Sequence, residues 1–104
     1  MAVQPEKTPV LDLLERITMS SLEASSLDPR SVMLVRIAAL VAVDAAPASY
    51  LMNLGFAGEA GVTEEQIEGL LAAVAPIVGT ARIVSATDKL ARALDLKMGL
   101  ELEE

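Results

Sequence analysis

The sequence predicts an all-α fold, a single-domain bundle of about five helices. Its 104 residues suit one domain. No segment alternates apolar and polar residues as a strand would, whereas proline recurs at positions where a helix would begin. The apolar content of 53% is almost entirely aliphatic, with one Phe, one Tyr and no Trp. So much aliphatic surface on a small chain is typical of a protein that buries part of it against copies of itself.

The first two helices are predicted from their opening residues. Thr8 and Pro9 provide an N-cap and a first helical residue, and the serines at 20–26 indicate the end of this helix. Val10, Leu14 and Ile17 share one of its faces.

Asp28 and Pro29 repeat the opening signal for a second helix that extends to about Val43. Its second half, "IAALVAV" from Ile37, is apolar all round, which predicts burial on every side.

The third helix is predicted to begin at Pro47 and to end before Gly61. A capping box at residues 63–66, "TEEQ", predicts the start of the fourth helix. Pro76 should end or kink that helix, because proline lacks an N–H and clashes with the preceding turn. Its expected inner stripe consists of Ile67, Leu70, Leu71 and Val74.

The last helix is predicted to follow Gly79. Its expected inner face consists of Ile83, Thr87, Leu90 and Leu94. We therefore divide the single domain into an N-terminal helix and linker (1–26), a core (27–95) and a tail (96–104) that frays or docks on a neighbouring subunit.

The charge of the chain disfavours several classes of partner. The net charge is -7, and no Lys or Arg lies between Ile37 and Ala81. Phosphate binding needs clustered cations, so we expect neither nucleic acid nor an anionic membrane as a partner. No signal peptide is visible, and the longest apolar stretch is interrupted by polar residues and proline. We therefore expect a cytoplasmic protein.

The sequence contains no cysteine and no histidine. Disulfides, thiol catalysis, Cys/His metal sites and histidine acid–base mechanisms therefore have no residues to carry them. The acidic residues do not form the loop of alternating ligands that a calcium site uses. We expect no metal and no cofactor.

The order of several short segments resembles the carboxymuconolactone decarboxylase family, the group related to alkylhydroperoxidase D. The resemblance spans about residues 27–94 and rests on "LDPRSVMLVRIAALVAV", "ASY", "AGVTEEQIEGLLAAVAPIVG" and "ARIVSATDKLARAL". It implies an all-α, alkylhydroperoxidase D-like fold whose subunits assemble as trimers or hexamers. It also implies pockets close to the subunit contacts.

The reactive residues of that family are absent from this sequence. Peroxidase-type members carry two cysteines and a histidine on the third helix, at positions that correspond here to Ala48, Leu51 and Gly55. Decarboxylase-type members commonly have a glutamate at the second of these positions and keep the histidine. A further family glutamate falls between Met33 and Arg36, where no acid stands. The resemblance therefore does not extend to thiol peroxidase or disulfide reductase chemistry.

The remaining polar residues suggest two groups of candidates. Asp44 and Tyr50 are the candidate catalytic acid–base residues, although Asp44 could equally cap a helix and Tyr50 could be a core aromatic with its hydroxyl satisfied. The candidate ligand-binding residues are Arg36, Asn53, Arg82 and Ser85.

Each of these candidates also has a structural interpretation. Arg36 could clamp a carboxylate or pair with an internal acid. Asn53 could bond a ligand or a nearby loop, and Arg82 with Ser85 could hold an anion or simply face solvent at the start of the last helix.

Three functions follow from these alternatives. The first is a homo-oligomer with a pocket for a small carboxylated or apolar molecule near the subunit interface. The second is a divergent decarboxylase or lactone-processing enzyme that uses Asp44 and Tyr50. The third is a purely structural or partner-binding oligomer. The missing cysteines and histidines favour the first and third over the second.

Overall fold

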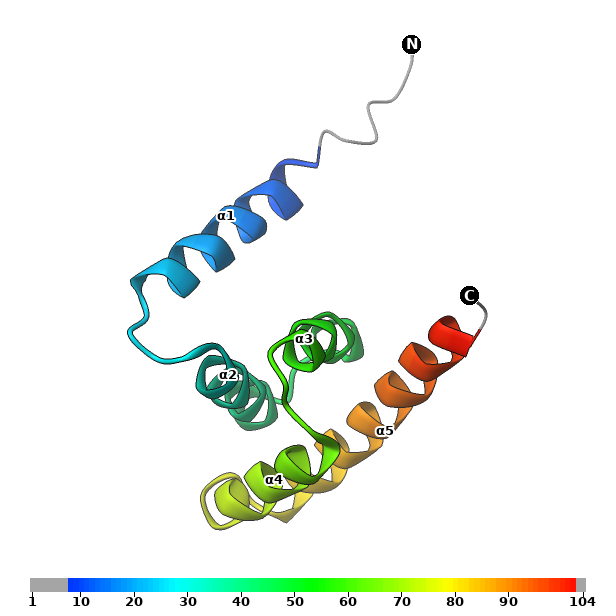
Figure 1. Ribbon diagram of the computed structural model, residues 1–104. Coiled ribbons are helices and arrows are strands. Elements are labelled where there is room, and N and C mark those ends of the chain that lie inside the picture. The colour runs from blue at the N-terminus through cyan, green and yellow to red at the C-terminus, as the bar shows by residue number, and fades with distance from the viewer. Residues whose placement is uncertain (1–7, 103–104) are drawn as a thin grey trace.

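The computed structural model describes the backbone of residues 8–102 and the side chains of residues 8–95. Within these residues the chain forms five α-helices and no strand, so the predicted all-α fold is confirmed. The helices are α1 (Pro9–Ala24), α2 (Pro29–Val43), α3 (Pro47–Glu59), α4 (Glu64–Val78) and α5 (Thr80–Leu102). Figure 1 shows α2 to α5 packed together, while α1 extends away from them.

The hydrophobic core lies entirely among α2, α3, α4 and α5. Ile37 and Val41 of α2 are completely buried, and Tyr50 of α3 is 1% exposed. The α3 helix packs mainly against α5 and α2, and α2 also packs against α4. The other buried apolar residues are Val32, Met33, Leu54, Ala57, Ile67, Ala86, Leu90 and Ala93.

The predicted bounds of α2 are confirmed, but its burial differs from the prediction. The Asp28 carboxylate accepts a hydrogen bond from the Ser31 N–H at 2.9 Å and caps the helix. Asp44 ends it in the left-handed conformation, with φ of 54°. Burial on every side is wrong for the described chain, because Val43 is 72% exposed. Only the face of α2 that meets α3, α4 and α5 lies in the core.

The turn between α3 and α4 follows the sequence signals. Gly61 has φ of 87°, which favours glycine, and Val62 N–H donates to the Ala57 carbonyl oxygen across the turn. Both bonds of the predicted capping box form: Gln66 N–H donates to Thr63 Oγ1, and Thr63 N–H donates to Gln66 Oε1.

The Pro76 and α5 predictions hold in part. Pro76 lies in the last turn of α4, and the helix ends two residues later. The α5 helix continues past Asp95 to Leu102, through a segment that lacks proline and consists of good helix formers apart from Gly99. Thr87 is exposed and bonds the carbonyl of Ile83, so its predicted place on the inner face is wrong.

The α1 helix has no buried residue. Thr8 occupies the N-cap position but makes no side-chain capping bond. The exposed apolar side chains of α1 are Val10, Leu11, Leu13, Leu14, Ile17, Met19 and Leu22, with exposed fractions between 37% and 68%. Complete burial of each such half-exposed side chain would stabilise the protein by roughly 1 kcal/mol more. The described chain therefore does not bury the apolar side chains of α1.

Candidate functional site

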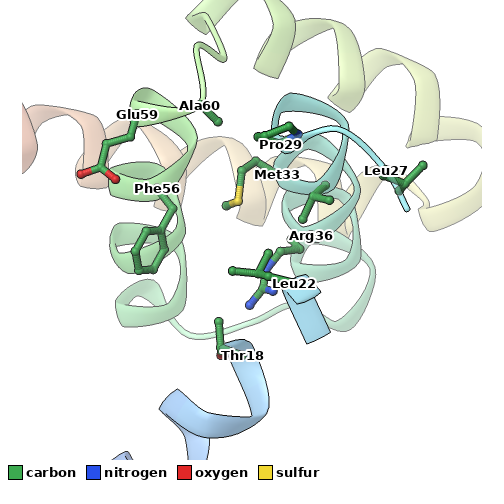
Figure 2. A pocket seen from close by; sticks show the side chains of 10 residues that line it. Thr18, Leu22, Leu27, Pro29, Met33, Arg36, Phe56, Glu59 and Ala60 are labelled. Carbon is green, nitrogen blue, oxygen red and sulfur yellow. The ribbon is translucent and has the colours of Figure 1, made fainter. Parts of the chain in front are cut away.

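A cavity of about 370 Å³ lies where α1, α2 and α3 meet (Figure 2). This volume falls in the range of ordinary small-molecule pockets. Its walls are mostly apolar and come from the C-terminal half of α1, the linker after it, the first half of α2 and the last turns of α3. The lining residues are Thr18, Leu22, Leu27, Pro29, Val32, Met33, Arg36, Phe56, Glu59 and Ala60.

Arg36 provides the positive charge in this pocket. Its Nε donates to Asn53 Oδ1 at 3.3 Å, and Asn53 Nδ2 donates in turn to the Ser49 carbonyl oxygen at 2.8 Å. Asn53 is only 9% exposed, so its amide is fixed between two helices. Within the described residues, no carboxylate forms a salt bridge with Arg36. The alternative interpretation of Arg36 as half of an internal ion pair therefore finds no support there.

The pocket combines apolar side chains with one guanidinium. Leu22 and Met33 provide apolar contact beside the guanidinium (Figure 2), and Phe56 of α3 also lines the pocket. The guanidinium has five N–H donors, and the amide of Asn53 engages only one of them. Glu59 lines the opposite end of the pocket, and in Figure 2 its carboxylate turns away from Arg36.

Asp44 and Ser85 belong to a different cluster, between the α2–α3 turn and α5. Ser85 Oγ donates to Asp44 Oδ1 at 2.7 Å, and Lys89 Nζ donates to the same oxygen at 3.0 Å. Lys89 Nζ also donates to the Ala45 carbonyl oxygen at 2.7 Å. The bonds from Ser85 and Lys89 hold the pKa of the Asp44 carboxyl below its usual value, and the bond from Ser85 has the larger effect. A lowered pKa makes Asp44 a weaker general base.

Tyr50 is a core residue. Its ring is 1% exposed, which agrees with its interpretation as a core aromatic. Its hydroxyl has no hydrogen-bond partner within the described part of the chain, in contrast to the satisfied hydroxyl that this interpretation assumed. Burial raises the pKa of this hydroxyl, and the charge of Asp44 adds to the effect. Tyr50 does not line the pocket that contains Arg36.

The candidate binding residues therefore separate into two places. Arg36 and Asn53 meet at the pocket, whereas Ser85 lies with Asp44. Arg82 is exposed, and its Nη1 donates to the Val78 carbonyl oxygen at 3.4 Å. Sequence reasoning missed Lys89, although it lies four residues after Ser85 and so on the same face of α5.

Sequence reasoning also missed the apolar walls of the pocket. Nothing in the sequence shows that Met33, a buried core residue, also lines a pocket. Nor does the sequence show that Phe56, the single phenylalanine, lines the pocket while 48% exposed. Within the described residues there is no group of three or more acidic side chains that could hold a metal ion. The helices found there are too short or too polar to cross a membrane.

A comparison with known protein families shows which family the chain belongs to. The sequence model of the carboxymuconolactone decarboxylase family matches residues 8–92, which is most of the chain. The chain belongs to this family. No curated protein and no solved structure matches it. The match to the family begins at residue 8, so the family domain includes α1 as well as the α2–α5 core.

The positions that the family resemblance assigns to reactive groups lie on α3. Ala48 is exposed and Leu51 is partly buried against the core. A Cβ added at Gly55 would have no atom within 4 Å outside its own stretch of helix. The resemblance places the family glutamate within residues 33–36. In that range, the charged residue that lines the pocket is Arg36. In this family member a cation therefore stands near the place where the resemblance expects an acid.

Proposed function

We propose that this member of the carboxymuconolactone decarboxylase family binds a small apolar carboxylate in the pocket between α1, α2 and α3. It does so without thiol peroxidase chemistry, because the sequence contains no cysteine. The single observation that carries the proposal is Arg36, a guanidinium without a carboxylate partner in the described chain, set in an otherwise largely apolar pocket.

The bond to Asn53 supports a role in binding. A neutral amide orients the guanidinium through Nε and leaves its charge unneutralised. The two Nη groups then remain as donors, and arginine matches a carboxylate with two parallel hydrogen bonds. An acidic partner in place of Asn53 would have removed this capacity.

Self-association is the second part of the proposal. The apolar side chains of α1 are mostly exposed in the single chain, and such a face is typical of an interaction surface. The family resemblance implies a trimer or a hexamer. Sedimentation equilibrium at micromolar concentration measures the mass, and a monomer would contradict this part.

The binding proposal is tested with n-octanoate as a probe and n-octanol as its uncharged counterpart. Isothermal titration should give weaker binding of octanoate to Arg36→Gln by roughly tenfold, because the variant loses a charge-assisted contact. The affinity for octanol should change little. Arg82→Gln is the matched control, because Arg82 is exposed and lies outside the pocket.

Two results would contradict the proposal. Equal loss of octanoate affinity in both arginine variants would indicate a general charge effect. If octanoate and octanol bound neither to the wild type nor to the variants, the protein would fit better as a structural or partner-binding oligomer.

A further inference from the structure

The outer half of α1 presents an apolar face with nothing beneath it in the described chain. Val10, Leu14 and Ile17 lie within about a fifth of a helical turn of one another, and they are 68%, 51% and 54% exposed. Asp12, Arg16 and Glu23 lie on the opposite side of the helix. The uncharged face therefore extends along α1 beyond Thr18 and Leu22, which line the pocket.

This helix is too weakly supported to stand alone. It has 16 residues, no buried side chain and no side-chain N-cap bond. Isolated helices of this length are marginal in water even when their sequence is rich in alanine. Its own bundle does not cover its outer half, because α1 extends away from α2 to α5 (Figure 1). Another surface must therefore pack against it.

A second copy of the chain is the occupant that fits best. The family match begins at residue 8, so α1 is part of the family domain, and its partner should be present wherever that domain is. The face carries no charge, so two identical copies meet there without bringing like charges together. An anionic membrane surface would instead meet a chain of net charge -7.

The matching surface on the second copy is the exposed edge of α3 beside the pocket. Phe56, the single phenylalanine, lines the pocket yet is 48% exposed. Met52, one turn earlier on the same side of α3, is 61% exposed. Apolar side chains at a pocket mouth lose contact with water when an apolar helix covers them.

We propose that the outer half of α1 docks on a second copy of the chain, over the Met52–Phe56 edge of α3, and closes the mouth of that copy's pocket. The pocket of one copy is then incomplete without α1 of the other. This rests on the proposed function in one respect, that the pocket holds a ligand. Closure excludes water from the Arg36–carboxylate contact, so ligand binding and association strengthen each other.

The test compares two double variants of the full-length chain. In Leu14→Glu/Ile17→Glu, two charges enter the α1 face at positions that do not line the pocket. In the control, Ile77→Glu/Val84→Glu, the same change is made at the far side of the bundle, where the side chains are 86% and 63% exposed. Sedimentation velocity gives the mass, circular dichroism the helix content, and titration the affinity for n-octanoate.

We expect the α1 variant to dissociate and the control to keep the wild-type mass. The dissociated α1 variant should also lose helix content and bind octanoate about fivefold or more weakly. By the same coupling, octanoate should raise the assembled fraction of the wild type and not of the α1 variant. Met52→Glu, on the other side of the contact, should reproduce the dissociation without any change in α1.

Three outcomes would overturn the inference, and they differ from failure of the proposed function. One is an α1 variant that keeps the wild-type mass, and another is a control that dissociates equally. The third is a dissociated α1 variant with unchanged octanoate affinity, which would rule out closure of the pocket. If octanoate does not bind the wild type at all, the proposed function fails, while the masses of the α1 variant, Met52→Glu and the control still decide the docking.

Discussion

The α1 and α2 helices begin with the same kind of sequence signal, but they differ in how far their apolar side chains are buried. Each opens with a polar cap position followed by proline, at Thr8–Pro9 and at Asp28–Pro29. Yet α2 buries Val32, Met33, Ile37 and Val41, whereas α1 buries nothing. An amphipathic pattern therefore predicts that a helix forms and which face is apolar, but it does not reveal whether the partner of that face belongs to the same chain.

The difference between the two helices should be largest for a core substitution. Ile37→Ala, at a completely buried position, should lower the free energy of unfolding by about 2–5 kcal/mol, because it removes buried methyl groups and leaves a cavity. Ile17→Ala makes the same chemical change at a side chain that is 54% exposed. In the dissociated chain it should change that free energy by less than about 0.5 kcal/mol. Urea denaturation at low protein concentration measures both.

A higher protein concentration should affect the two variants differently. If α1 packs on a second copy, Ile17→Ala should become more destabilising as the protein associates, whereas the cost of Ile37→Ala should stay nearly constant. A large cost of Ile17→Ala at every concentration would mean that α1 packs on its own bundle, and the contrast between the helices would disappear.

Much of the fold was predictable because its signals are local. Capping residues, prolines and Gly61 act on their own turns, so the bounds of α2 and the start of α4 followed directly from the sequence. Burial is not local. Val43 was predicted to lie in a segment buried on every side and Thr87 on an inner face, both from the pattern alone. Which face meets a neighbour depends instead on how four helices cross.

The candidate site was predictable only as a set of residues. Arg36 and Asn53 stood out because they interrupt apolar helices, and the structure joins them. Ser85 and Asp44 are 41 residues apart in the chain, and no sequence signal links them to each other or separates them from the pocket. Tertiary contacts across α2, α3 and α5 decide this grouping, and the identity of the pocket walls depends on the same contacts.

The second expected difference concerns how the helices are capped, and it compares two threonines. Thr63→Ala removes a side-chain bond to the Gln66 N–H at the start of α4 and should cost about 1 kcal/mol of stability. Thr8→Ala removes no capping bond from α1 and should change the stability very little. Thermal unfolding of the two variants beside the wild type measures this difference. A similar cost for both would show that the Thr8 hydroxyl caps α1 in solution.

The smallest expected effect concerns pH and the cluster that fastens the α2–α3 turn to α5. The bonds from Ser85 and Lys89 lower the pKa of Asp44 in the folded chain relative to its unfolded value of about 3.9. A carboxyl with a lowered folded pKa stabilises the protein above its unfolded pKa, and this contribution is lost as the pH falls through the folded pKa.

Asp44→Asn is the variant that isolates this contribution, because asparagine also tolerates the left-handed conformation found at this position. The wild type should be more stable than Asp44→Asn at pH 7, and the gap should close as the pH falls below about 4. Denaturation of both proteins across this pH range measures the gap. Since the α1 contact that we propose is apolar, the mass of the assembly should stay the same in Asp44→Asn at pH 7. A change in mass would show instead that the Asp44 cluster, rather than α1, supports the association of subunits.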